Sequence, residues 1–156
     1  MNDIRKNLRP ELDALENARD ILGYSYKKCS GIGEKIGFSP EELESFEALT
    51  SRFARLSDII IQKIFRLFDI LDLEEPGTVR DRINHAEKKG VIKSADEFIQ
   101  IRILRNEIAH EYRAETIYDI FEHVMKLTPT LLKSVDRILL YSEKYFKKQD
   151  LKTESV

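Results

Sequence analysis

The sequence has little cysteine and lacks any long apolar run. Cys29 is the single cysteine among 156 residues, so neither an internal disulfide framework nor a cysteine-rich zinc site can form. No stretch approaches the roughly 20 consecutive apolar residues of a membrane span, and the N-terminus lacks the apolar core of a signal peptide. We therefore expect a soluble protein of the cytoplasm, with no membrane partner.

An excess of charge of one sign is also missing. The chain has 26 Lys and Arg residues against 28 Asp and Glu residues, which gives a formal net charge of -2. Proteins that coat duplex nucleic acid are usually strongly basic, so the overall charge does not indicate that class. A local basic patch remains compatible with this nearly neutral total.

Alternating strand patterns are absent as well, and helical spacing dominates the chain. The fold class predicted is all-α, as an up-and-down four-helix bundle with one additional short helix. We expect one domain over residues 1–150 and a disordered polar tail over 151–156. The predicted helices cover about 4–26, 40–74 and 79–90, followed by one opening after Ser94 and a last one beginning near Glu115 or Thr116.

Local signals mark where these helices begin and where they could be interrupted. Three starts carry capping pairs, in which a hydroxyl and a carboxylate three positions later bond the first turn: Ser39 with Glu42, Thr78 with Asp81, and Ser94 with Glu97. Pro10 is expected to begin or kink the first helix, because proline lacks a backbone N–H. For the same reason Pro129 is expected to kink or break the last helix.

The second predicted helix has more apolar surface than one core-facing stripe requires. Its main stripe, mostly at spacings of three and four, is Phe46, Leu49, Phe53, Leu56, Ile60, Ile64, Leu67 and Leu71. A second strip adds Ile61, Phe65 and Phe68. The extra width indicates a helix buried on two sides, either centrally in the bundle or at a dimer interface, and we favour the dimer.

An arginine interrupts the apolar stripe of the fourth predicted helix. That stripe comprises Phe98, Ile101, Arg105, Ile108 and Tyr112. A guanidinium cannot be neutralised, so Arg105 requires a carboxylate, a phosphate or an open cleft. One interpretation is a structural ion pair with Asp58 or Asp69 of the second helix.

A polar and mostly basic strip lies on another face of the same helix. It consists of Arg102, Asn106, His110 and Arg113, and His110 is turned about 140° from Arg105. A solvated helix face would explain the strip. A histidine that titrates near neutrality and an arginine that binds a phosphoryl oxygen also suit phosphodiester chemistry. Because Arg105 and His110 do not share a face, a cleft between two copies of the helix would bring both together.

One segment of this helix fits the pattern Arg, four residues, His, any residue, Tyr. It reads Arg105-Asn106-Glu107-Ile108-Ala109-His110-Glu111-Tyr112. This motif on the penultimate long helix of a small bundle resembles the HEPN superfamily, and specifically its HepT-like toxins. The resemblance implies a metal-independent endoribonuclease that needs no cofactor and acts as a homodimer on RNA. Arg105 and His110 would be catalytic and Asn106 would support them.

The resemblance also implies a partner protein. HepT-like toxins are commonly encoded with a minimal nucleotidyltransferase antitoxin, which can transfer AMP to the motif tyrosine in a type VII toxin–antitoxin system. Tyr112 would then be the modified residue, and Arg102 and Arg113 would be RNA contacts.

Other interpretations stay open. The chain could be a non-catalytic HEPN-like module that binds a nucleotidyltransferase, with Arg105 as a buried structural charge, or a plain helical dimerisation protein. His85 and His123 do not pair with His110 at a chelating spacing, so we expect surface or packing roles for them and no metal site. Cys29 has no convincing base beside it and is taken as incidental.

Overall fold

The computed structural model describes residues 3–33, 37–110 and 117–154, and side chains in the last range as far as Lys147. Every regular element in these ranges is a helix, which confirms the predicted all-α class. Helix α1 covers Ile4–Ser30, α4 covers Val79–Lys88, α5 covers Ala95–His110 and α6 covers Ile117–Glu154. The second long helix consists of α2 (Pro40–Asp58), a π-helical segment η1 (Ile59–Ile64) and α3 (Phe65–Leu71) in direct succession.

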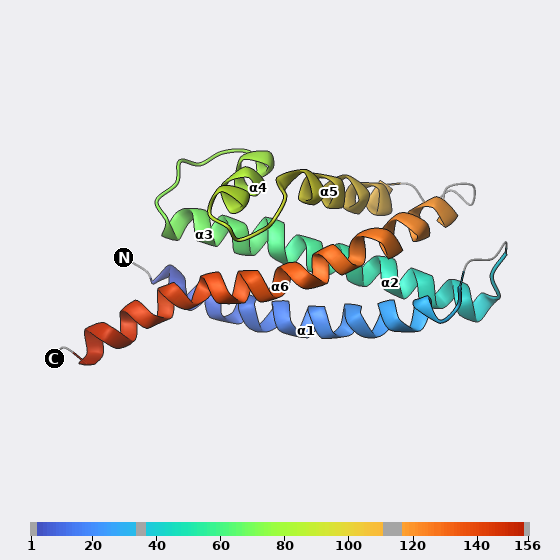
Figure 1. Cartoon of the computed structure of the whole chain (residues 1–156), viewed down its shortest axis with the longest axis horizontal. Helices are drawn as coiled ribbons and strands as arrows, with labels where there is room; N and C mark the ends of the chain where they lie inside the picture. Colours follow the sequence, from blue (N-terminus) through green and yellow to red (C-terminus); the bar gives the residue numbers. More distant parts are fainter. Residues whose placement is uncertain (1–2, 34–36, 111–116, 155–156) are drawn as a thin grey trace.

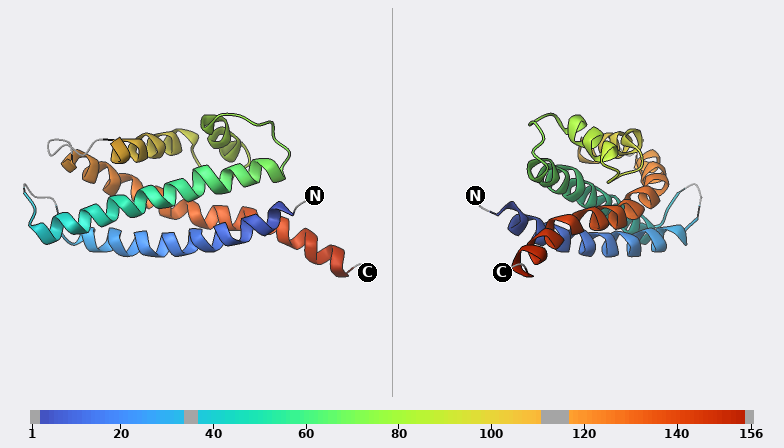
Figure 2. Two further views of the ribbon diagram at one scale, coloured as in Figure 1. Left: turned by 180° about the vertical axis from the view of Figure 1, so that it is seen from behind. Right: turned by 60° about the vertical axis from the view of Figure 1, so that its left-hand side comes forward.

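The long helices lie side by side, with the α2–η1–α3 rod in contact with every other helix of the chain. Helix α1 packs along the rod and along α6, whereas α4 and α5 cover the other side of the rod (Figures 1 and 2). Buried apolar residues from all the helices form one continuous core. Within the described ranges, no helix combines the length and apolarity needed to cross a membrane.

The capping pairs predicted from the sequence begin the helices as expected. Both hydrogen bonds of the capping box are present for Ser39 with Glu42 and for Thr78 with Asp81. The Glu97 N–H donates to Ser94 Oγ at 3.2 Å at the start of α5. These bonds satisfy N–H groups that the first turn of a helix leaves without a partner, so the starts follow from local sequence.

The expected helix end at residue 26 is wrong, and of the kink or break expected at Pro129, the break does not occur. Helix α1 continues to Ser30 because its buried face continues through Ser25 and Cys29. Helix α6 passes through Pro129 without interruption and extends to Glu154, into the segment predicted to be a tail. Buried residues on both sides of the proline, Val124 and Leu131, keep α6 seated on the core. Packing along the helix outweighs the one backbone hydrogen bond that proline removes.

Pro10 does not begin the first helix either. Helix α1 starts earlier, at Ile4, where the Asp3 side chain accepts a hydrogen bond from the Arg5 N–H at 3.1 Å. The aspartate cap therefore sets the start, and the proline lies inside the helix.

The wide apolar surface of the second helix follows from its π-helical turn. Before the turn, the buried side chains follow the predicted stripe as far as Leu56, and Ile60 continues it inside the turn. The N–H of Phe65 then bonds to the carbonyl of Ile60, five residues back, so the turn holds one residue more than an α-helical turn. Beyond it, Phe65 and Phe68 are buried, while Leu67 and Leu71 of the predicted stripe are only half-buried.

The two predicted strips are thus successive parts of a single core-facing seam, which rotates about the helix axis at η1. Ile59, Ile61 and Ile64 within the turn are also at most 6% exposed in the single chain. The central position in the fold accounts for the burial on two sides, so the width of this helix gives no support for a dimer.

Candidate functional site

Helix α5 leaves Arg105 partly exposed and does not bury it within its apolar face. The buried stripe is Phe98, Ile101, Leu104 and Ile108, so Leu104 takes the core position predicted for Arg105. On an ideal helix Arg105 falls between Phe98 and Ile101, yet it is not among the buried residues of α5. Its side chain keeps 32% of its surface exposed, which corrects the expectation of an arginine buried in an apolar face.

The guanidinium of Arg105 forms a bidentate ion pair with Asp58, the last residue of α2. Nε lies 2.7 Å from Oδ1, and Nη2 lies 2.9 Å from Oδ2. The hydrogen bonds that Arg105 donates to Asp58 raise the pKa of Arg105 because they favour its charged form. Asp58 is one of the two partners predicted. The other, Asp69, bonds instead to His85 at 3.0 Å and to Lys89 at 3.2 Å.

The remaining polar residues of the motif lie on the outward face of α5. Asn106 and His110 are exposed and Arg102 is half-buried, in line with the predicted polar strip. Ile103 lies on the same face with 53% of its surface exposed. Among the residues that the structure describes, no hydrogen bond joins Arg105 to His110. Tyr112 and Arg113 lie outside the described residues.

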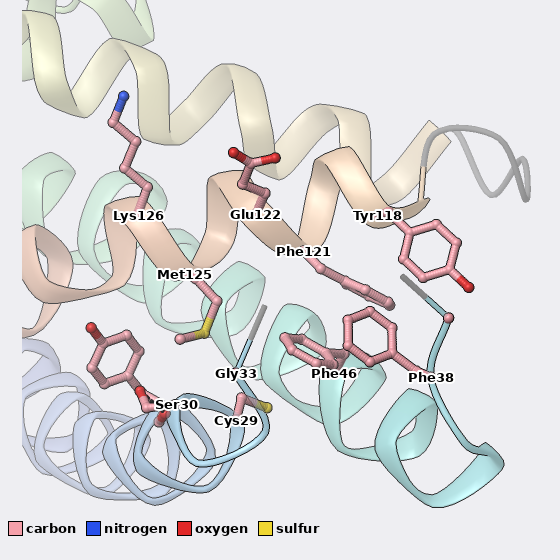
Figure 3. A pocket seen from close by; sticks show the side chains of 12 residues that line it. Cys29, Ser30, Gly33, Phe38, Phe46, Tyr118, Phe121, Glu122, Met125 and Lys126 are labelled. Atoms are coloured by element: carbon pink, nitrogen blue, oxygen red, sulfur yellow. Dashed lines mark hydrogen bonds between the residues drawn. The ribbon is translucent and has the colours of Figure 1, made fainter. Parts of the chain in front are cut away.

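A groove of about 1040 Å³ opens where the end of α1, the start of α2 and the first turns of α6 meet (Figure 3). Four aromatic rings, those of Phe38, Phe46, Tyr118 and Phe121, contact one another in its wall, with centroid separations from 4.8 to 6.4 Å. Among the described residues, the charged side chains in its lining are Glu122 and Lys126 of α6. The sequence did not reveal this groove, because its walls come from segments about 80 residues apart.

Cys29 lies in the wall of the groove but has the properties of a packing residue. It is 2% exposed, and its Sγ lies 3.4 Å from the carbonyl oxygen of Ser45. Burial raises the pKa of the Cys29 thiol, and the positive charge of Lys28 opposes this only in part. A thiol kept protonated is a poor nucleophile, which agrees with the incidental role expected.

The remaining histidines lie on helices other than α5. His85 of α4 is half-buried against Asp69, and His123 is exposed on α6. In the described ranges, no three His, Cys, Asp or Glu side chains are grouped so that they could hold a metal ion.

A second charged cluster, centred on Asp72 after α3, was not predicted. Tyr141 and Tyr145 donate hydroxyl hydrogen bonds to its carboxylate, and Lys89 and Lys144 each place an Nζ 3.0 Å from it. Burial alone would raise the pKa of Asp72, but the four hydrogen bonds outweigh burial and lower it to about 2. We call these five residues the Asp72 cluster. Its members come from three segments far apart in the chain, so no local pattern indicates it.

The chain matches no model of a known protein family, and it matches no curated protein sequence either.

Proposed function

We propose that this protein is a metal-independent endoribonuclease of the HepT-like group of the HEPN superfamily, acting in the cytoplasm as the toxin of a type VII toxin–antitoxin system. The observation that supports this most directly is the arrangement of the motif on α5. The Arg105 guanidinium is anchored yet a third exposed, and Asn106 and His110 lie exposed further along the same helix. Arg105 and His110 are the proposed catalytic residues, and Asn106 supports them.

The proposed reaction uses the ribose 2′-hydroxyl of RNA as its nucleophile. The 2′-oxygen attacks the adjacent phosphorus, the bond from phosphorus to the 5′-oxygen breaks, and a 2′,3′-cyclic phosphate and a 5′-hydroxyl result. His110 exchanges a proton with the 2′-hydroxyl or with the leaving oxygen, and Arg105 stabilises the charge that develops on the phosphate. DNA lacks the 2′-hydroxyl and is not cleaved by this route.

The proposal includes an up-and-down four-helix bundle of HEPN type with a short extra helix, paired with a second copy through the outward face of α5. Ile103, 53% exposed between polar residues, would lie at the centre of that interface. Pairing would bring the His110 residues of both copies together, with each Arg105 at the rim of the shared cleft. Sedimentation should detect a dimer, and Ile103→Asp should convert it to monomer.

A nucleotidyltransferase antitoxin is the proposed partner. It would transfer AMP to Tyr112, two positions after His110, and the added phosphate would exclude RNA by size and charge. Arg102 and Arg113 are the proposed RNA contacts. Mass spectrometry of the protein after incubation with such a partner and ATP should show an added AMP on Tyr112, and modification at another residue would refute this assignment.

The deciding experiment measures cleavage of single-stranded RNA in excess EDTA. Wild-type protein should cleave RNA but not the matching DNA, and His110→Ala or Arg105→Ala should reduce the rate by about 100-fold or more. His123→Ala is the matched control, because His123 is an exposed histidine outside the motif, and it should keep wild-type activity. Circular dichroism and sedimentation should show that each variant stays folded and keeps its oligomeric state. Full activity in His110→Ala would rule out the catalytic assignment.

A non-catalytic HEPN-like module that binds a nucleotidyltransferase is the second candidate. The ion pair between Arg105 and Asp58 favours it, since that interpretation expects a paired arginine. The exposure of the pair weighs against it, because the charge is not buried and does not require neutralisation by the fold. Binding of the partner without any RNA cleavage by wild-type protein would favour this candidate.

A further inference from the structure

The way Asp58 holds Arg105 leaves one edge of the guanidinium open. A guanidinium has five N–H donors in a plane, divided between a side edge, made by Nε and one Nη, and an end edge, made by both Nη atoms. Asp58 occupies the side edge, through Nε at 2.7 Å and Nη2 at 2.9 Å. No other described residue forms a hydrogen bond with Arg105. The end edge therefore remains for a second anion, and two phosphate oxygens fit it in the same bidentate way.

The ion pair contributes too little to folding to account for its geometry. The two side chains are 32% and 37% exposed, and water competes strongly for ion pairs with such exposure. An unpaired arginine side chain at this site would be free to occupy many rotamers. Two well-aligned hydrogen bonds restrict it to one, which is the kind of restriction that a group acting on a transition state requires.

The π-helical turn keeps Asp58 apart from the core seam. In an uninterrupted α-helix, Asp58 would share one stripe with Phe65 and Phe68. Because η1 begins at the next residue and adds one residue to the turn, both phenylalanines are buried in the core, where Phe65 packs against Phe98 of α5, while Asp58 bonds to Arg105 and stays partly exposed. Single π-helical turns occur frequently at functional sites, and here the turn lies directly beside the carboxylate that holds Arg105.

We infer that Asp58 is a positioning residue for catalysis, which fixes the side edge of Arg105 so that the end edge faces the scissile phosphate. This inference rests on the proposed ribonuclease function. It assigns a role in the reaction to a residue outside the motif, on a different helix. It also assigns the ion pair between Arg105 and Asp58, which by itself favours a non-catalytic module, to the catalytic site.

Asp58→Asn should separate positioning from folding in the kinetics of RNA cleavage. The kcat should fall by roughly 10- to 100-fold, the loss typical of a misplaced catalytic group. The KM for RNA should stay the same or decrease, since a negative charge is removed close to the phosphate. A merely structural residue would instead lower the active fraction and leave KM and the kcat of the folded protein unchanged. Asp58→Glu retains the carboxylate and should recover part of the lost kcat.

Asp136→Asn is the matched control. Asp136 also pairs with an arginine, since its Oδ1 lies 3.4 Å from Arg19 Nη1, but the pair joins α1 and α6 away from the motif. This variant should keep the kcat and KM of wild-type protein.

Chemical rescue gives a sharper test. Millimolar guanidinium should restore part of the activity of Arg105→Ala, because Asp58 can bind the free ion where the side chain was. The same concentration should not rescue the double variant Arg105→Ala/Asp58→Asn. Equal rescue of both variants, or a wild-type kcat in Asp58→Asn, would overturn the role of Asp58 while leaving the ribonuclease proposal intact. If wild-type protein fails to cleave RNA, the proposed function and this inference both fail.

Discussion

The ion pair of Arg105 with Asp58 and the Asp72 cluster both connect the α2–η1–α3 rod to other parts of the fold, yet they differ in how completely their groups are used. The Asp72 side chain is 14% exposed and receives hydrogen bonds from four groups. Arg105 and Asp58 are each about a third exposed, and no described residue other than Asp58 bonds to the guanidinium. A carboxylate whose oxygens all accept hydrogen bonds within the fold contributes to stability. A guanidinium that is held on one edge only can also donate hydrogen bonds to a ligand.

The first test of this contrast removes the carboxylate of the Asp72 cluster, where the largest change in the free energy of unfolding is expected. Asp72→Asn should lower the free energy of unfolding at pH 7 by about 2 kcal/mol, since a pKa held near 2 against an ordinary value of 3.8 corresponds to a stabilisation of this order. Urea unfolding at pH 7 measures the difference. An unchanged midpoint would show that the cluster is not structural.

The dependence of stability on acid pH should also reveal the contribution of Asp72. The pKa of Asp72 is lower in the folded than in the unfolded chain, so its contribution is present above pH 3.8 and is lost as the pH falls through 3.8 toward 2. Unfolding measured from pH 5 to pH 2 should show this loss in wild-type protein and a smaller one in Asp72→Asn. Parallel curves would contradict the lowered pKa.

A smaller change in the free energy of unfolding is expected for a substitution at Leu73, the residue that follows Asp72. Leu73 has a φ of 59°, in the left-handed region, and 91% of its surface is exposed. Its N–H bonds to the carbonyl of Ile70 and the N–H of Glu74 to that of Asp69, which is the helix end where glycine is favoured. Leu73→Gly should therefore raise the free energy of unfolding by about 1 kcal/mol.

Leu73→Ala is the matched control for this change. Alanine keeps the β-carbon that makes a positive φ unfavourable. Removing the rest of the leucine side chain costs few contacts, because that side chain is exposed. The alanine variant should therefore have nearly wild-type stability. A gain equal to that of the glycine variant would show that backbone conformation is not the cause.

The smallest change in stability is expected at the motif arginine. Arg105→Met removes the ion pair but keeps a long side chain. The free energy of unfolding, measured by thermal unfolding, should therefore change by less than about 1 kcal/mol. The same variant should lose RNA cleavage under the proposed function. A large loss of stability, similar to that of Asp72→Asn, would place Arg105 among the structural charges and favour the non-catalytic module.

The sequence was informative about helices and about the candidate site wherever the deciding interactions are local. The boxes at Ser39 and Thr78 and the polar strip of Asn106 and His110 depend on residues three or four positions apart, and the structure confirms them. The core position assigned to Arg105 was wrong because Arg105 and Leu104 fit the apolar spacing equally well. Only the packing against α2 distinguishes them.

Composition, helical periodicity and capping residues were sufficient for the all-α class, for most helix boundaries and for the placement of Arg105 and His110 on one helix. The extra residue in η1, the passage of α6 through Pro129, the choice of Asp58 over Asp69 and the whole Asp72 cluster required the tertiary structure. The physical reason is one of range. A helix is held by hydrogen bonds between near neighbours in sequence, whereas these features depend on contacts between helices; Asp58 lies 47 residues from Arg105, and Asp72 lies 73 residues from Tyr145.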